Sequence, residues 1–123
     1  MGSNADTIRE FIGKWSNLDP AELAAYFTED GCYHNMPFQR IEGREAVEQF
    51  IAGFTDTWTA TEWEVLNLTE SGDVVFCERI DRTRSTAGDV DLPCVGVFEM
   101  QDGKIREWRD YFDLATYTGA MSG

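Results

Sequence analysis

Two charged residues fall on the inward face of a predicted β-strand, in the stretch FCERIDRT at residues 76–83. Side chains alternate between the two faces of a strand, so Arg79 and Asp81 share a face with Val75 and Cys77. Val75 and Cys77 are residue types that a small domain buries. A buried charge is costly unless it is paired or used in chemistry, so this Arg-x-Asp pattern indicates a functional site.

Two further segments place polar groups among residues that are expected to point inward. In WRDYFD, Asp110 shares a face with Trp108 and Phe112. In CYHNMP, Tyr33 and Asn35 share a face. We therefore predict that the polar residues of all three segments meet in one cavity and form a catalytic set: Tyr33, Asn35, Arg79, Asp81 and Asp110.

These residue types suit acid–base catalysis. The Arg79 guanidinium is a rigid fork of donors that can bind the carboxylates of Asp81 and Asp110 at once. Two close carboxylates resist ionising together, so we expect one to be ionised and the other protonated, as a coupled pair. Such a pair supplies a general base and a general acid in one dry cavity. Tyr33 and Asn35 could hold a water molecule beside the base.

Each of these residues also has an ordinary structural interpretation. An Arg-x-Asp pair on a strand is usually a surface salt bridge, and Tyr33 could fill the core with its hydroxyl at the rim. A register slip of one residue would turn Asp110 to solvent. Asp113 has the opposite parity to Asp110, so we interpret it as a helix cap or a surface residue. His34 should face outward and take no part in catalysis.

The overall composition excludes several classes of partner. The chain has 123 residues, a net charge of −13 and only 10 Lys and Arg residues. Nucleic acids and anionic membranes attract clustered positive charge, so we predict that neither is a partner. The length supports one domain over residues 1–123, and the 42% hydrophobic content supports one packed core. A neutral or apolar ligand fits this composition.

The start of the chain and the cysteines favour a cytoplasmic protein. We expect residues 1–4 to be disordered or a tag remnant, and we find no pattern of a signal peptide in the N-terminal segment. Cys32, Cys77 and Cys94 are odd in number and widely spaced, which indicates reduced, buried thiols. With one His and no CxxC pair, we predict no transition-metal site.

Apolar residues at helical spacing predict three helices in the first half of the chain. The first covers about 5–15, and the third about 44–54. The second begins with Asp19 as N-cap and Pro20 in the first helical position, and we expect it to stop near Gly31. The CYHNMP segment is then a short strand that ends before Pro37.

The second half changes to a period of two, which predicts strands. They cover about 62–69, 74–84, 92–100 and 104–112, and a short tail at 114–121 could be helical. Asp102-Gly103 is a strong hairpin signal. Helices gathered on one side of an antiparallel meander define an α+β fold, and a curled sheet would enclose a pocket against them.

The three polar segments and their neighbours resemble the limonene-1,2-epoxide hydrolase family, within the folds like nuclear transport factor 2 and ketosteroid isomerase, which include SnoaL-like proteins. The resemblance covers nearly the whole chain and is densest in four stretches and in the spacings between them: YFTEDGCYHNMP, GREAVEQFIAG, ERIDR and GVFEMQDGKIREWRDYFDL. The family carries Tyr-x-Asn before Met-Pro, Arg-x-Asp on a strand and a Trp-Arg-Asp-Tyr-Phe-Asp run, and all three are present here.

The resemblance implies a strongly curved mixed β-sheet with three to four helices on its concave side, one deep pocket and a homodimer. It also implies one-step hydrolysis of an apolar, terpene-like or cyclic epoxide to a vicinal diol. Asp110 would take a proton from a water molecule held by Tyr33 and Asn35, while Asp81 protonates the epoxide oxygen and Arg79 bridges the acids. No cofactor is required.

The resemblance does not identify the residues of the pocket wall, because we expect the wall to be specific to this chain. Our candidates for substrate binding are apolar or aromatic residues near the polar set: Trp58, Leu92, Cys94, Trp108 and Phe112. Two other functions stay open. A cyclase or isomerase of the same fold could open an epoxide with an internal hydroxyl, and a non-catalytic domain could bind an apolar ligand.

Overall fold

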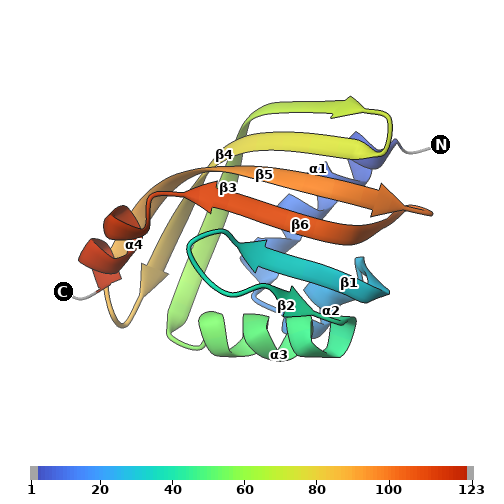
Figure 1. Ribbon diagram of the computed structural model, residues 1–123. Coiled ribbons are helices and arrows are strands. Elements are labelled where there is room, and N and C mark those ends of the chain that lie inside the picture. The colour runs from blue at the N-terminus through green and yellow to red at the C-terminus, as the bar shows by residue number, and fades with distance from the viewer. Residues whose placement is uncertain (1–2, 122–123) are drawn as a thin grey trace.

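The computed structural model describes residues 3–121 and contains one six-stranded sheet with four α-helices (Figure 1). The helical elements are α1 (Asn4–Lys14), η1 (Trp15–Asn17), α2 (Pro20–Ala24), α3 (Arg44–Phe54) and α4 (Leu114–Met121). The strands are β1 (Phe27–Asn35), β2 (Ile41–Glu42), β3 (Trp58–Ser71), β4 (Val74–Ser85), β5 (Asp89–Gln101) and β6 (Lys104–Phe112). Within residues 3–121, no helix is long and apolar enough to cross a membrane.

The first helix begins earlier than its apolar pattern predicted, because a polar cap precedes it. The Ser3 side chain accepts a hydrogen bond from the backbone of Asp6, and the Asp6 side chain accepts one from the backbone of Ser3. This capping box satisfies two backbone donors at the helix start. Residues 1–2 of the segment expected to be disordered lie outside the described residues, whereas Ser3 and Asn4 belong to the helix start.

The second helix starts as predicted but ends early, so the prediction of an end near Gly31 was wrong. Asp19 is the N-cap and accepts from the backbone of Glu22, but α2 already ends at Ala24. The chain then enters β1 at Phe27, which pairs in parallel with Ile105 of β6. A long-range backbone pairing therefore overrides the helical pattern that continues locally through this segment.

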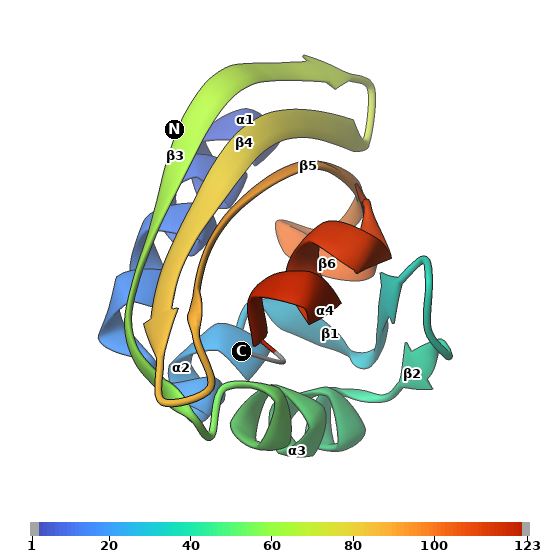
Figure 2. The ribbon, with the colours of Figure 1, turned by 90° about the vertical axis from the view of Figure 1, so that its left-hand side faces the viewer.

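The sheet is mixed and strongly curved, as the resemblance implied. Its strand order is β2-β1-β6-β5-β4-β3, with β1 parallel to β6 and the other pairs antiparallel. Figure 2 shows β3, β4 and β5 bending as arcs, with α3 below them and α4 inside the curve. The four long strands fall at the predicted places, and α3, β6 and α4 have the predicted bounds.

Burial alternates along β4, which confirms the register on which the site prediction depends. Val75, Cys77, Arg79, Asp81 and Thr83 are all buried, while the residues between them are exposed or half-buried. The strand therefore has one face in the core and one face toward the outside of the sheet.

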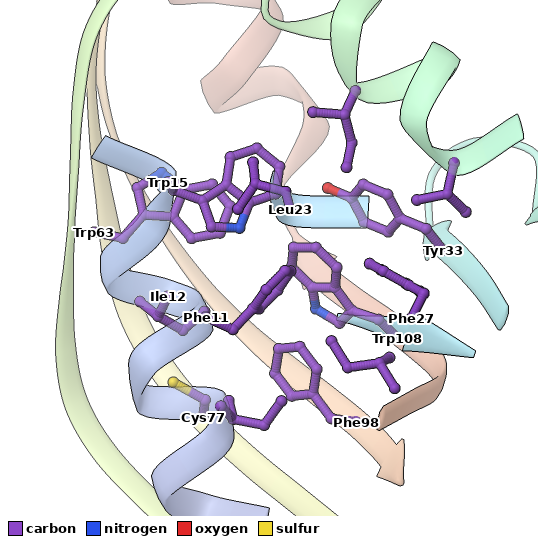
Figure 3. Packing of buried hydrophobic residues seen from close by; sticks show 14 of the residues in the cluster. Phe11, Ile12, Trp15, Leu23, Phe27, Tyr33, Trp63, Cys77, Phe98 and Trp108 are labelled. Atoms are coloured by element: carbon purple, nitrogen blue, oxygen red, sulfur yellow. The ribbon is translucent and has the colours of Figure 1, made fainter. Parts of the chain in front are cut away.

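The core is rich in aromatic rings, which come from α1 and from the concave face of the sheet (Figure 3). Trp15 stacks on Trp63 with ring centroids 4.1 Å apart, and Phe11 meets Trp108 edge-on at 5.2 Å. Aromatic pairs of this kind add to the free energy gained by apolar burial. Helix α1 thus packs against β3 and β4 on the concave face of the sheet, whereas α3 packs against β1 and α4 against β5.

Candidate functional site

One guanidinium joins the two acids that the sequence analysis singled out. Arg79 donates from Nε to Asp81 Oδ1 over 2.8 Å and from Nη2 to Asp81 Oδ2 over 3.2 Å. It also donates from Nη1 to Asp110 Oδ1 over 3.0 Å, and from Nη2 to Asp110 Oδ2. All three side chains are buried, and Arg79 is 0% exposed. The predicted carboxylate–guanidinium–carboxylate bridge is therefore present, and a surface salt bridge is excluded.

The order of the strands explains how Arg79 reaches Asp110. Arg79 and Asp81 lie on β4, Asp110 lies on β6, and β5 runs between them. Two strand spacings separate β4 from β6 by roughly 10 Å, which is within the reach of an arginine side chain. Gly96 of β5 is paired with Asp110, and its missing side chain leaves room for the guanidinium. A Cβ there would lie 2.8 Å from Arg79 Nη1 and 2.9 Å from Asp110 Oδ1.

Neighbouring side chains hold the bridge in place. The Arg79 guanidinium carbon lies 4.4 Å from the ring centre of Trp63 and 5.5 Å from that of Trp108, so both rings give cation–π contacts. Trp108 Nε1 donates to Asp110 Oδ1 over 2.8 Å, and Cys94 Sγ donates to Asp81 Oδ2 over 3.3 Å. Each acid therefore has a second donor besides Arg79.

The electrostatics differ from those of a surface salt bridge. Burial raises the pKa of Asp81 from 3.8 to about 6, and the opposing attraction of Arg79 only partly offsets it. Burial disfavours the charge on Arg79, but Asp110 and Asp81 together raise its pKa well above the ordinary value. The guanidinium thus stays charged, and Asp81 holds a proton more firmly than an exposed carboxyl does.

Tyr33 and Asn35 lie beside the acids, as predicted, because β1 runs parallel to β6. Asn35 is paired with Asp110 in this register, and Tyr33 with Trp108. The Tyr33 ring stacks on Trp108 with centroids 4.2 Å apart, and burial, followed by the charge of Asp110, raises the pKa of its hydroxyl well above the ordinary value. Asn35 Nδ2 is buried and has no hydrogen-bond partner among residues 3–121. This amide therefore presents a free donor next to the acids.

A cavity opens next to the acids. Its polar lining includes Tyr33, Asn35, Asp81 and Asp110. The remaining lining is largely apolar and aromatic: Phe54, Trp58, Trp63, Thr83, Val90, Leu92, Phe112 and Tyr117. This combination of an apolar wall with a few convergent polar groups is typical of a small-molecule site.

The five predicted substrate-binding residues divide into two groups. Trp58, Leu92 and Phe112 line the cavity. Cys94 and Trp108 are not among its lining residues, and instead each donates a hydrogen bond to one of the acids. Both have inward parity, but alternation alone does not distinguish a residue in the cavity wall from one buried behind it.

Five lining residues were not among the predicted site residues: Phe54, Trp63, Thr83, Val90 and Tyr117. Thr83 could have been found, because it shares the inward face of β4 with Asp81. Tyr117 lies on α4, and only the docking of that helix against β5 brings it to the cavity. No local pattern identifies such a residue.

Two residues near the site have the outward positions that were predicted for them. Asp113 is exposed and caps α4, because its side chain accepts from the backbone and the hydroxyl of Thr116. His34 is half-buried on the outer side of β1, and its Nε2 meets the Phe38 carbonyl at 3.0 Å. Neither residue lines the cavity.

The same acids could in principle bind a cation, but their surroundings do not favour it. Asp81, Cys94 and Asp110 each offer one ligand atom, within 4.8 Å of one another. Arg79 already bonds both carboxylates, and its charge would repel a metal ion at this distance. Burial raises the pKa of the Cys94 thiol, which keeps it in the protonated form that does not bind metals well.

Comparisons with known proteins agree with this geometry. A family model for the limonene-1,2-epoxide hydrolase catalytic domain matches residues 2–122. The epoxide hydrolase EphG of Mycobacterium tuberculosis is 29% identical over 107 residues, which cover 87% of this chain and 71% of that protein.

Solved structures show the same fold. An M. tuberculosis LEH-like epoxide hydrolase is 27% identical, with a TM-score of 0.83 over 98% of this chain and 90% of that chain. A putative SnoaL-like polyketide cyclase from Jannaschia is 22% identical, with a TM-score of 0.85 over 98% of this chain and 92% of that chain. The second likeness concerns the fold alone, because this fold is shared by proteins of many functions.

We predict that Gly96→Ala breaks the bridge. The added Cβ would press on Arg79 Nη1 and Asp110 Oδ1, so one of them must move, and overpacking in a core costs about 1–3 kcal/mol. Urea unfolding should show that loss. The matched control is Gly13→Ala at an exposed position of α1, where a Cβ meets nothing within 4 Å; it should stabilise the protein by about 0.5–1 kcal/mol. A Gly96→Ala variant as stable as the parent would contradict the close packing of the bridge.

We also predict that Asp81 makes the parent protein less stable as the pH rises. Its pKa is about 6 when folded and 3.8 ordinarily, so the folded state binds the proton more tightly between these values. The free energy of unfolding should therefore fall from about pH 4 to about pH 6, by about 3 kcal/mol in total. About 1 kcal/mol of this lies between about pH 5 and pH 7, clear of the isoelectric point near 4.2.

Asp81→Asn should lack this contribution, so its stability relative to the parent should rise by that amount over the same pH range. The control for the lost charge is Asp102→Asn in the exposed turn between β5 and β6. Equal pH dependence in the parent and in Asp81→Asn would show that Asp81 is ionised in the folded state as readily as in the unfolded chain.

Proposed function

Because the chain belongs to the limonene-1,2-epoxide hydrolase family, we propose that it is a cofactor-independent epoxide hydrolase. It adds water to an apolar, terpene-like or cyclic epoxide in one step and releases a vicinal diol. The single observation that carries this proposal is the buried bridge of Arg79 between Asp81 and Asp110 at the cavity wall. A domain that only bound an apolar ligand would have no need of two acids and a guanidinium in its core.

In the proposed reaction, Asp110 is the general base. A water molecule held by Tyr33 and Asn35 gives one proton to Asp110 as its oxygen attacks an epoxide carbon. The buried, unpartnered Nδ2 of Asn35 supports this role, because a donor beside the base can bind the water oxygen and leave its protons for the base. The raised pKa of Tyr33 keeps its hydroxyl neutral, and its oxygen can accept a hydrogen bond from the second proton of the water. One lone pair of the water oxygen then stays free to attack the epoxide carbon.

Asp81 is the general acid. Its pKa, raised by burial to about 6, supports this assignment, because about half of the carboxyl is protonated at pH 6 and can deliver its proton to the epoxide oxygen as the carbon–oxygen bond breaks. One proton leaves the water for Asp110 and one leaves Asp81 for the product, so the negative charge moves from one acid to the other. Arg79 bonds both carboxylates and stabilises the charge in either position. The next cycle needs one proton to return from Asp110 to Asp81.

The machinery is sufficient for this substrate class. The ring strain of an epoxide is released on opening, so the reaction needs a modest nucleophile and a timely proton. General acid and general base catalysis each contribute about 10²–10⁴-fold, and a positioned water molecule adds to this. The apolar cavity wall, which includes Leu92, Val90 and Phe112, suits a hydrocarbon skeleton.

The proposal extends to a homodimer in the cytoplasm, as the sequence analysis predicted. The outer face of the sheet supports the dimer, because it exposes the large apolar residues Leu66, Phe76, Val95 and Tyr111. An apolar patch on a sheet face is a common site of association.

Sedimentation equilibrium tests the dimer and should give a molar mass twice that of the chain. Tyr111→Glu places a charge in the apolar patch, so it should shift the measured mass toward that of the monomer. A monomeric parent protein would contradict this part of the proposal.

The test of the activity is hydrolysis in ¹⁸O-labelled water. With limonene 1,2-epoxide or cyclohexene oxide, we expect a diol that carries the label in one hydroxyl. An epoxide opened without solvent oxygen in the product would instead indicate a cyclase or isomerase. No turnover over a broad panel of epoxides would contradict the proposal.

Two isosteric variants test the roles of the acids. Asp110→Asn and Asp81→Asn should each lower kcat by at least about 100-fold, because each removes one proton transfer. Both should still unfold cooperatively, because Asn keeps the shape of Asp and its oxygen can still accept a hydrogen bond from Arg79. The matched control is Asp113→Asn, which changes the neighbouring acid that caps α4 outside the cavity and should retain activity close to that of the parent. Unchanged turnover in Asp110→Asn or Asp81→Asn would refute that residue's role.

A further inference from the structure

A second polar position lies in the cavity, on a different strand from the acids. Trp58 lines the cavity at the start of β3 and is 9% exposed. Its indole Nε1 is buried and has no hydrogen-bond partner among residues 3–121. Buried N–H groups are nearly always paired, so an unpaired one on a cavity wall points to a ligand.

The backbone is shaped to aim this indole inward. Thr61 and Trp63 are buried at odd positions of β3, so regular alternation would turn Trp58 outward. The pairing with β4 shifts between Trp58 and Ala60, and this bulge places Trp58 on the buried face. Bulges commonly re-aim a side chain next to a functional site.

A second polar group accompanies the indole. Tyr117 of α4 also lines the cavity, and both Trp58 and Tyr117 contact the ring of Phe54. Burial raises the pKa of the Tyr117 hydroxyl, and the nearby indole N–H lowers it to a smaller extent. The indole N–H and the Tyr117 hydroxyl are thus close neighbours, but they do not reach the geometry of a full hydrogen bond, so a ligand oxygen can compete with the hydroxyl for the indole donor.

This position lies at a different level of the sheet from the acids, although both line the same cavity. Asp81 is paired with Trp63, and Trp58 lies five residues earlier on the same strand. That distance along β3 is at most roughly 16 Å between Cα atoms, at about 3.3 Å per residue. Apolar side chains, among them Val90, Leu92 and Phe112, complete the wall of the cavity.

We infer that the substrate is an oxygenated epoxide, whose second oxygen, remote from the epoxide ring, accepts a hydrogen bond from Trp58 Nε1. A carbonyl, ether or hydroxyl oxygen has the required acceptor, whereas a pure hydrocarbon skeleton would leave the indole N–H unpaired. This inference rests on the proposed epoxide hydrolysis and narrows its substrate class. It assigns Trp58 a role in specificity, separate from the proton transfers at Asp81 and Asp110.

The test compares two epoxides that differ in one heavy atom. They are limonene 1,2-epoxide and the ketone in which oxygen replaces the methylidene carbon of its isopropenyl group. The shapes are nearly the same, so kcat/KM should favour the ketone by about 3- to 10-fold, as expected for one neutral hydrogen bond. The preference should appear mainly in KM, because this contact is remote from the reacting atoms.

Trp58→Phe keeps an aromatic ring and removes the donor, so the ratio of the two kcat/KM values should fall to about one. Phe112→Leu is the control: it reshapes the cavity wall without removing a donor, so the preference for the ketone should persist. A parent protein that does not favour the ketone, or a preference retained in Trp58→Phe, would overturn the inference.

A binding measurement separates this inference from the proposed activity. If neither epoxide is hydrolysed, the proposed function fails, and the dissociation constants of the two saturated analogues that lack the epoxide can still be measured by calorimetry. Tighter binding of the ketone to the parent, lost in Trp58→Phe, would uphold the donor role of Trp58. Equal affinities in the parent would overturn it.

Discussion

The guanidinium of Arg79 lies in the interior of the molecule, and its charge is tolerable there only because two carboxylates bond it. Removing a full charge from water costs several kcal/mol even after relaxation, so neither the arginine nor the acids would be buried singly. Together they carry one positive and two negative charges, and the excess negative charge is relieved when one acid holds a proton. Burial is the main cause of the raised pKa of Asp81, and the nearby charge of Asp110 adds to it. Each of the three buried groups thus depends on the other two.

The residues around this bridge provide both contacts and space for the guanidinium. A flat cation requires a flat, electron-rich surface, which Trp63 and Trp108 provide. A side chain that crosses an intervening strand requires a position without a Cβ, which Gly96 provides. The aromatic rings also keep water away from the acids, which strengthens every electrostatic interaction among them. The aromatic core and the polar site are therefore one structure rather than two.

The sequence pattern predicted correctly those features that depend only on residues close together in the chain. Alternation on β4 correctly placed Arg79 and Asp81 inward, and the opposite parity of Asp113 correctly placed it outside, as the cap of α4. Those inferences depend only on the two-residue period of a strand and on the preference of Asp for helix starts. The end of α2 was misjudged, because the pairing of Phe27 with β6 is a contact between segments far apart in the chain.

The amino-acid sequence by itself determined which residues carry charge into the interior, the type of most elements, and the family whose polar motifs the chain shares. Only the tertiary structure decided which strand lies between Arg79 and Asp110, and so gave Gly96 its part in the bridge. It also decided that Trp108 bonds an acid instead of lining the cavity, and that a bulge turns Trp58 inward. The physical reason is that these features depend on strand order and register between distant segments. Periodicity along one strand contains no information about its neighbours.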